Sequence, residues 1–244
     1  MTGQATPQDT IRTVDTGLML KVFYAFTVLV LLSLAISIGG KWFGTSIVMA
    51  GHSDSTKAHE IIIGNNVLAI PANMIRFERA RTDGIAARVD LYMRWPDMSG
   101  YSAEAQDDFN NVGGTRRILF VSIEEQAMSR DMSGRFAPIY SALIKQPGQA
   151  GPTGIMFHEF NEKSGYLNEV LAVAARAGDD PFVARCLTGA SAMDSLAPCE
   201  RDIHIGEHLS LTYRFPRELL GEWPALETGI ARKVAELLKT GKKP

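Results

Sequence analysis

Residues 22–40 form an unbroken apolar run with a lysine at each end, Lys21 and Lys41. At about 1.5 Å per residue, an α-helix of this length covers about 28 Å, close to the ~30 Å hydrocarbon thickness of a bilayer. No ionisable side chain lies within the run, which argues against ion conduction or a proton relay. The sequence therefore predicts a single-pass transmembrane helix at 22–40 that anchors the chain in a lipid bilayer.

The cysteines, rather than the basic residues, predict the orientation of this helix. Basic residues flank the run almost equally, whereas Cys186 and Cys199 both lie in the C-terminal part. A disulfide between them would close a short loop, which contributes about 3 kcal/mol in the chain-entropy model. Such bonds persist only in oxidising compartments. We therefore expect a short cytoplasmic tail at 1–21, a location in the bacterial inner membrane, and the C-terminal domain in the periplasm. Two unpaired thiols in a cytosolic domain are the alternative.

The segment after the apolar run bears on whether the helix is retained. Residues 48–50 are small enough for signal peptidase, but they lie well beyond the run, and the run is longer than the 7–15 residues of a signal-peptide core. A retained signal-anchor is the favoured interpretation, and cleavage is the alternative. The polar stretch at 41–58 predicts a stalk, and residues 59–244 are sufficient for one periplasmic domain.

Alternating and continuous apolar patterns predict strands in this domain. Residues 60–71 place apolar runs on both sides of Gly64, which is typical of a hairpin. Residues 88–95 alternate, with Val89, Leu91, Met93 and Trp95 on one face, and predict a half-buried strand. Residues 118–123 are continuously apolar and predict a central strand covered on both faces. Further strands are expected at 154–160, 166–176 and 181–187, although the second of these also fits a helical face.

The C-terminal part predicts a hairpin followed by a helix. A three-residue loop between 201–205 and 209–215 pairs Ile205 with Leu209 and Ile203 with Leu211, whereas a two-residue loop would mix apolar and polar side chains on one face. Helical spacing then continues from Pro216 to Gly241. Short helices are expected at 102–109 and 134–145. The fold class is therefore α+β: a transmembrane helix, a stalk, and a largely antiparallel β-sheet domain with a C-terminal amphipathic helix.

Two histidines four residues apart, His204 and His208, are the only weak candidates for a metal site. On a helix this spacing would direct both imidazoles to one ion. On the predicted hairpin, however, four extended residues span about 13 Å and cannot chelate. We therefore predict no metal.

Composition and motifs argue against other common chemistries. The chain carries 25 Lys and Arg against 27 Asp and Glu, with a formal net charge of −2 and no basic patch, so nucleic acid is not an expected partner. No phosphate loop is present, and Ser191 lacks the glycine that completes a nucleophile elbow. Adjacent acidic residues such as Glu124 and Glu125 point to opposite faces when they lie on a strand, and acidic pairs in loops are usually solvated. We therefore predict no cofactor and no catalytic residues, and the interpretation leans away from an enzyme.

Two groups of residues are candidates for a binding surface. Trp95, Asp97 and Tyr101 lie in a turn rich in aromatic and rigid residues, which fits either a buried corner or an exposed knob. The arginines near the predicted disulfide fit cross-strand ion pairs, or alternatively a site for a small anionic or peptide ligand. They are Arg185, Arg201 and Arg214.

Three segments carry a resemblance to a known group of proteins. IPANMIRFE at 70–78, LYMRWPDMSGYS at 91–102, and the pattern CERDIHIG followed by LSLTYRFP at 199–216 resemble uncharacterised single-span envelope proteins of alphaproteobacteria. The resemblance covers about residues 61–223. It implies a Gram-negative inner-membrane setting and no catalytic residue.

These observations favour a membrane-anchored periplasmic module that binds or organises another envelope component without catalysis. The expected partners are the lipid bilayer and an envelope protein, and a second copy of the chain is a further candidate. A periplasmic envelope hydrolase is the first alternative, and it would need convergent groups of perturbed pKa in a cleft. An extracytoplasmic sensor domain that signals through a membrane partner is the second.

Overall fold

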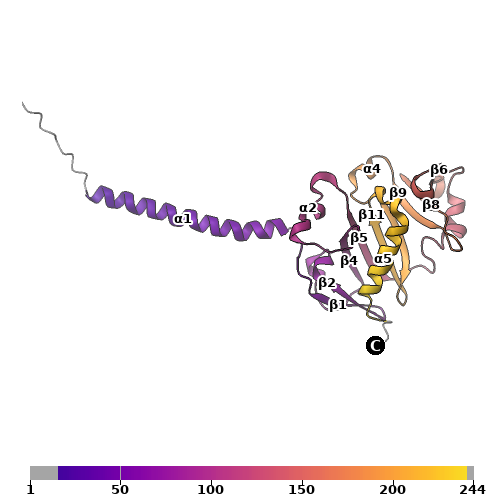
Figure 1. The fold of residues 1–244 in the computed structure, drawn as a ribbon, viewed down its shortest axis with the longest axis horizontal. Coiled ribbons are helices and arrows are strands. Elements are labelled where there is room, and N and C mark those ends of the chain that lie inside the picture. Colours follow the sequence, from indigo (N-terminus) through magenta and orange to yellow (C-terminus); the bar gives the residue numbers. More distant parts are fainter. Residues whose placement is uncertain (1–15, 50, 241–244) are drawn as a thin grey trace, which may run out of the picture. The chain divides into compact units, whose positions relative to one another are not determined.

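The computed structural model describes residues 16–49 and 51–240. Contacts divide the chain into two compact units, Met1–Ala50 and Gly51–Pro244. Most of the tail predicted at 1–21, and one residue of the candidate cleavage motif, lie outside the described residues. Figure 1 shows the order of the elements along the chain.

The described residues of the first unit form one helix, α1 (Thr16–Met49). Its segment Gly17–Ile38, 22 residues long, is long and apolar enough to cross a membrane by length and composition, and its side chains are exposed within the structure. The predicted apolar helix is therefore present. The helix also extends beyond the predicted span through the first part of the segment predicted as a stalk.

The second unit is an α+β domain, as predicted. Its main sheet has eight strands in the order β4-β5-β11-β10-β9-β8-β7-β6, and all the neighbours in it are antiparallel. A smaller sheet has the order β2-β1-β3, in which β1 and β3 are parallel. The strands are β1 (Ala58–Ile63), β2 (Asn66–Pro71), β3 (Gly84–Ile85), β4 (Arg88–Arg94), β5 (Ile118–Glu125), β6 (Gln149–Ala150), β7 (Ile155–Glu159), β8 (Glu169–Ala174), β9 (Phe182–Leu187), β10 (Cys199–Ile205) and β11 (Leu209–Phe215).

Most helices of this unit are single turns. The longest is α5 (Trp223–Leu237), with Pro224 in its first turn, where a missing backbone N–H costs nothing. The other α-helices are α2 (Gln106–Phe109), α3 (Ser141–Leu143) and α4 (Gly189–Asp194). A π-helical turn covers Phe136–Tyr140, and 3₁₀ turns cover Ala72–Met74, Glu78–Ala80, Ala103–Ala105, Val112–Gly114, Pro152–Gly154, Glu162–Ser164 and Arg217–Glu222.

The predicted register of the β10–β11 hairpin is confirmed, and the hairpin predicted at residues 60–71 is present as β1 and β2. Ile203 pairs with Leu211 and Ile205 pairs with Leu209, across a loop of three residues. In the first hairpin Ile63 pairs with Asn66, and Gly64 has a φ of +55° in the turn. This φ lies in the left-handed region that glycine adopts without strain.

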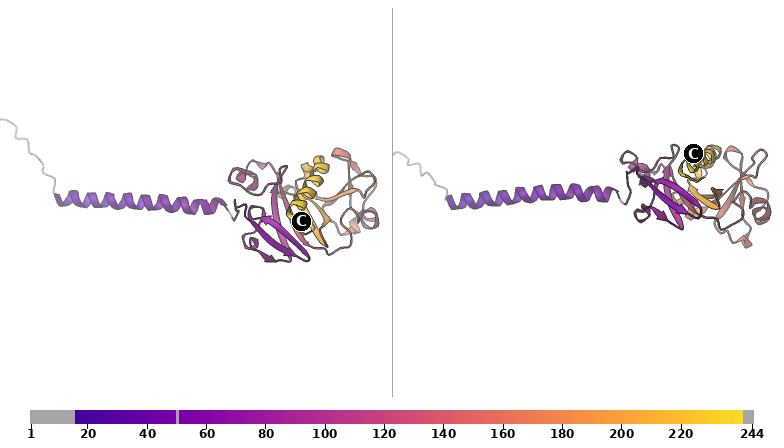
Figure 2. Two further views of the ribbon diagram at one scale, coloured as in Figure 1. Left: turned by 60° about the horizontal axis from the view of Figure 1, so that its bottom comes forward. Right: turned by 90° about the horizontal axis from the view of Figure 1, so that it is seen from below.

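Helix α5 covers one face of the main sheet, as Figure 2 shows. Its apolar stripe is buried against inward-facing residues of the strands, and burial of this kind supplies most of the stability of an amphipathic helix. After the helix, the backbone N–H of Lys239 donates to Val67 O over 2.8 Å, which ties the C-terminal end of α5 to the smaller sheet. The buried stripe of α5 is Leu226, Ile230, Val234 and Leu237.

The opposite face of the main sheet is covered only in part. Over β8 and β9 it packs against a second apolar cluster, in which Leu171 and Val183 contact Tyr140 and Phe160. Both faces of these two strands are therefore buried. This burial explains why their sequences are continuously apolar and why β8 resembled a helix in the sequence.

The two halves of the main sheet meet at a narrow junction. Strands β10 and β9 pair at only two positions, Cys199 with Cys186 and Glu200 with Arg185, whereas β10 and β11 pair at seven. The two cysteines of the first pair form a disulfide. Beyond this point the carbonyl of Val183 accepts a hydrogen bond from the side chain of Arg201 and not from the β10 backbone.

Residues 51–57, predicted as part of a stalk, lie against the domain. Ser55 O accepts a hydrogen bond from the Asn73 N–H over 2.8 Å, and Gly51 O accepts one from Arg81 Nη2 over 2.6 Å. The His52 ring stacks on the ring of Tyr101, with centroids 4.5 Å apart. The polar sequence does not reveal this docking because backbone carbonyls make most of its hydrogen bonds.

The strand β4 alternates as predicted, but the aromatic cluster under His52 covers part of its outer face. Tyr92 was placed on the outer, solvated face, but it is 2% exposed. Its ring lies 4.9 Å from that of Phe109, and its hydroxyl lies 3.0 Å from His52 Nδ1. Burial raises the pKa of the Tyr92 hydroxyl, so this group is neutral at physiological pH.

The docking of residues 51–57 should weaken in acid. Burial lowers the pKa of His52 below its ordinary 6.5. When residues 51–57 are released, His52 takes up a proton as the pH falls through 6.5. The docked His52 takes up a proton only at a lower pH, so acid favours the released state and docking is strongest above pH 6.5. We expect the amide-exchange protection factor of Asn73 N–H to fall between pH 7 and pH 5. His52→Phe, which keeps a ring on Tyr101 but cannot titrate, should abolish this dependence, and an unchanged dependence in that variant would refute the assignment.

The disulfide should stabilise the domain because it links β9 and β10 covalently at their short junction. Replacing both cysteines, Cys186→Ala with Cys199→Ala, should lower the free energy of unfolding by about 3 kcal/mol through the lost constraint on the unfolded chain. Urea denaturation of the full chain in mild detergent measures this loss. Reductant should lower the free energy of unfolding of the wild type to a similar value and leave that of the variant unchanged. A loss below about 1 kcal/mol would contradict the stabilising role of the disulfide.

Candidate functional site

The uncovered part of the main sheet forms a groove of about 500 Å³. Outward-facing residues of β4, β5, β10 and β11 make its floor, and the loop between the two cysteines forms one rim. We call it the open-face groove. It is lined by Arg76, Arg88, Asp90, Leu91, Phe120, Val121, Ser122, Glu124, Asp194, Ser195, Leu196, Ala197, Glu200, Thr212 and Arg214.

A hydrogen-bonded set of polar side chains occupies the β4–β5 side of the floor. Asp90 and Ser122 are directly opposite in the register. Arg88 donates to Asp90 Oδ1 over 2.7 Å and to Ser122 Oγ over 2.6 Å, and Ser122 donates to the same Asp90 oxygen. Burial alone would raise the pKa of Asp90, but the hydrogen bonds from Arg88 and Ser122 lower it overall. The carboxylate is therefore charged at neutral pH and is already occupied by Arg88.

A second set surrounds Glu200 at the β10 side. Arg185 donates to Glu200 Oε1 over 2.7 Å and lies 3.4 Å from Glu169 Oε2. Although burial would lower the pKa of Arg185, these two carboxylates raise it. Arg214 Nε lies 4.0 Å from Glu200 Oε2. The structure therefore brings together two of the three arginines singled out in the sequence, beside the disulfide.

An aromatic ring lies between the two sets. Phe120 is directly opposite Arg214 in the β5–β11 register and opposite Tyr92 in the β4–β5 register. The guanidinium carbon of Arg76 lies 4.8 Å from the centroid of its ring, at the range of a cation–π contact. The floor of the groove thus combines an apolar ring with arginines.

The rim of the groove comes from the loop that the disulfide closes. This loop contains α4, and its residues from Asp194 to Ala197 line the groove. Leu196 is 42% exposed and Met193 is 71% exposed. Arg116 Nη2 lies 3.4 Å from Met193 O, so a neighbouring loop also holds α4. Apolar side chains are therefore available to a partner at this rim.

The third arginine, Arg201, is not part of the groove. It lies on the other face of the sheet and is 1% exposed. Its Nη1 donates to Val183 O over 2.7 Å and to Ser133 Oγ over 3.0 Å, and its Nη2 donates to Glu227 Oε1 over 2.7 Å. Arg201 is therefore a structural residue that fills the gap where β9 and β10 part.

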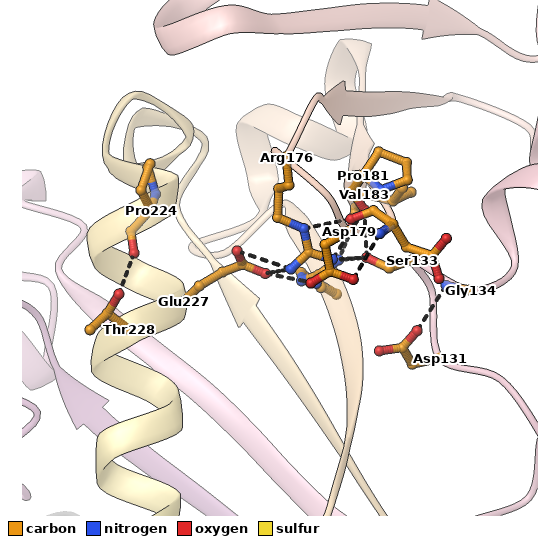
Figure 3. A network of polar contacts seen from close by, with 12 residues as sticks. Asp131, Ser133, Gly134, Arg176, Asp179, Pro181, Val183, Pro224, Glu227 and Thr228 are labelled. Carbon is orange, nitrogen blue, oxygen red and sulfur yellow. Dashed lines mark hydrogen bonds and ion pairs between the residues drawn. The ribbon is translucent and has the colours of Figure 1, made fainter.

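Figure 3 shows how this buried network joins separate elements. Glu227 of α5 also forms an ion pair with Arg176, in which Arg176 Nη1 lies 3.3 Å from Glu227 Oε1. Arg176 in turn donates to Ser133 Oγ over 3.1 Å. Beside it lies a pocket of about 440 Å³ whose lining includes Tyr213. The Tyr213 hydroxyl and Arg201 Nε are buried and lack a hydrogen-bond partner within the described part of the chain. Burial raises the pKa of Tyr213, which keeps the hydroxyl neutral.

Of the candidate residues Trp95, Asp97 and Tyr101, the two aromatic residues are buried in a corner of the domain, whereas Asp97 is exposed. Trp95 is 5% exposed and Tyr101 is 1% exposed. The indole N–H of Trp95 donates to Glu222 over 3.2 Å, and Tyr101 lies under His52. Arg94 donates a hydrogen bond to the carboxylate of Asp97, which lowers the pKa of that carboxyl. Large aromatic rings are buried here because they fill the space between β4, α2 and α5.

The two histidines do not form a metal site. His204 lies in β10 opposite Ser210, whereas His208 lies in the turn with a φ of +55°. Among the residues that the structure describes, no group of three His, Cys, Asp or Glu side chains could hold a metal ion. The hairpin geometry that argued against chelation in the sequence is present.

Sequence reasoning missed several residues of the groove. Arg76 follows the 3₁₀ turn at Ala72–Met74, and the backbone N–H of Arg76 donates to Asp90 O of β4. This hydrogen bond brings the side chain of Arg76 to Phe120, and no local pattern in the sequence predicts it. Arg88 and Asp90 carried a signal, because both stood on the predicted outer face of β4. The signal for Phe120 was misleading, since its apolar strand suggested burial on both faces.

No protein-family model matches the chain, and no curated protein does. A solved immunity protein of the Stenotrophomonas maltophilia type IV secretion system is similar in fold, with a TM-score of 0.50 and 15% identity over 78% of this chain and 96% of that one. The iron-regulated outer membrane lipoprotein FrpD of Neisseria meningitidis has a TM-score of 0.40 and 9% identity over 75% of this chain and 95% of its own, which is too distant for an argument. The first likeness shows a shared fold and nothing about function.

Arg201 should contribute far more to the free energy of unfolding than Arg214, an exposed arginine of the groove. Arg201→Met leaves the buried Val183 carbonyl and part of the Glu227 carboxylate without a donor, which should cost about 3 kcal/mol or more. Arg201→Lys, which keeps the charge but not the fork of donors, should cost less. Arg214→Met should stay within about 0.5 kcal/mol of wild type because its side chain is exposed. Urea denaturation checks all three, and similar losses for Arg201→Met and Arg214→Met would refute the structural role.

Proposed function

We propose that this chain is a membrane-anchored, non-catalytic module of the bacterial cell envelope, and that it binds a protein partner in the open-face groove. The observation that carries the proposal is the groove itself. It is an uncovered part of the main sheet, with arginines and an aromatic ring on its floor and exposed apolar side chains on its rim. Aromatic residues and arginine are enriched where proteins bind one another.

The state of the acidic groups in the groove supports binding over catalysis. Asp90 is held by Arg88 and Ser122, and its pKa is lowered. Glu200 is held by Arg185. A general acid needs a pKa raised towards neutrality and a carboxyl that is free to reach its substrate. The carboxylates of Asp90 and Glu200 are fixed in ion pairs and are therefore not free to act as a general acid.

The disulfide and the apolar helix support the proposed location. A structural disulfide persists in an oxidising compartment, so we place the domain in the periplasm, with α1 retained in the inner membrane as a signal-anchor. The resemblance to alphaproteobacterial envelope proteins supports the same setting.

The location can be tested in intact cells. Membrane-bound chain should resist extraction with alkaline carbonate, because an apolar helix of this length is inserted essentially irreversibly. In spheroplasts, added protease should digest the domain. The cysteines should react with maleimide only after reduction. Digestion only after inner-membrane rupture would place the domain in the cytoplasm and refute the topology.

Occupation of the groove can be tested by photocrosslinking. A benzoylphenylalanine at Leu196, on the rim, should yield a discrete crosslinked envelope protein in cells, because the rim contacts whatever lies in the groove. Ile85 is 89% exposed and does not line the groove, so the same substitution there is the matched control. Equal crosslinking at both positions, or none at Leu196, would contradict a partner in the groove.

A further inference from the structure

The pairing of charges in the groove leaves two arginines without a full partner. Arg88 is occupied by Asp90 and Glu124, and Arg185 by Glu169 and Glu200. Arg76, in contrast, has no carboxylate within 4.0 Å anywhere in residues 16–49 or 51–240.

Arg214 is only weakly paired. Its one ion pair in the described chain is the 4.0 Å contact with Glu200, whose other oxygen Arg185 already holds at 2.7 Å. The side chain of Arg214 is 47% exposed. Its guanidinium donors are therefore available to an acceptor that enters the groove.

The two available guanidiniums lie on either side of an apolar surface. Arg76 stacks on Phe120, and Arg214 is directly opposite Phe120 across the β5–β11 ladder. Leu196, on the rim of the same groove, adds a second exposed apolar side chain. A ligand that satisfies this surface needs a carboxylate for each arginine and an apolar group between them.

The size and the remaining charges favour an extended chain over a compact anion. The groove of about 500 Å³ crosses several strands, which is more than one small acid fills. Asp194 also lines the groove and has no ion pair in the part of the chain described, so a dense anion such as phosphate is opposed at that end. A peptide can place its carboxylates at the arginines and keep them away from Asp194.

We propose that the open-face groove recognises an acidic, partly apolar segment of a partner protein, with Arg76 and Arg214 binding its carboxylates and Phe120 and Leu196 contacting its apolar side chains. This inference rests on the proposed function and adds the chemistry of the partner. Arg88 and Arg185 act as positioning residues, because they neutralise the carboxylates of the groove that would otherwise bind Arg76 and Arg214.

Fluorescence anisotropy on the full chain in neutral detergent micelles tests this chemistry. The probe is the heptapeptide GEFELEG, labelled with fluorescein at its N-terminus and amidated at its C-terminus, and its matched peptides, labelled in the same way, are GQFQLQG and GKFKLKG. We expect GEFELEG to bind about tenfold more tightly than GQFQLQG, since two of its three carboxylates can each gain an arginine. Binding should weaken as salt rises from 0.05 to 0.3 M because the arginines are exposed.

Variants assign the effect to the two arginines. Arg76→Gln and Arg214→Gln should each weaken binding of GEFELEG about fivefold and leave GQFQLQG unchanged. Arg79→Gln is the matched control, because Arg79 lies in the same segment and stacks on Phe77 but does not line the groove. Circular dichroism confirms that each variant is folded.

Several results would overturn the inference. These are equal binding of GEFELEG and GQFQLQG, tighter binding of GKFKLKG, no binding of GEFELEG up to about 1 mM, or a loss in Arg79→Gln equal to that in Arg214→Gln. Displacement of GEFELEG by an equal concentration of inorganic phosphate would indicate a small-anion site and would also refute it. The crosslinking experiment is independent of these outcomes, because it asks whether a partner occupies the groove in cells and not which chemistry the groove selects.

Discussion

The architecture of this domain depends on the short junction between β9 and β10. Two register pairs join the two halves of an eight-stranded sheet there, and one of the pairs is the disulfide between Cys186 and Cys199. Main-chain hydrogen bonds normally hold neighbouring strands together along their length. Here they are replaced, beyond two residues, by the side chain of Arg201. The junction is strong because a covalent bond and a buried, hydrogen-bonded guanidinium act at the same place.

The junction also explains how the two faces of the sheet come to differ. Arg201 extends to Glu227 of α5 on one face, which fixes the helix over the sheet. On the other face, the apolar cluster around Tyr140 covers only β8 and β9. The remaining surface over β4, β5, β11 and β10 is left open. The open-face groove is therefore a consequence of uneven coverage, and the loop closed by the disulfide becomes its rim.

Much of the fold was predictable because local patterns carry it. The register of the β10–β11 hairpin followed from one condition, that apolar residues share a face, and a shift by one residue would have reversed every side chain. The helical spacing of Leu226, Ile230 and Val234 predicted α5 in the same way. The site was predicted only in part. Arg185 and Arg214 meet at the groove, whereas Arg201 alternates to the opposite face, and Trp95 and Tyr101 are buried by elements far away in the sequence.

By itself the sequence determined the apolar helix, the α+β class, the register of the β10–β11 hairpin and the feasibility of a disulfide, since these depend on periodicity, composition and residue type within short segments. The tertiary structure alone decided that residues 51–57 dock on the domain, that Arg201 is buried, and that Arg76, Phe120 and Arg214 share one groove. The physical reason is that these features depend on which faces of distant elements pack together. A one-dimensional pattern records whether a side chain seeks burial, but not which partner buries it.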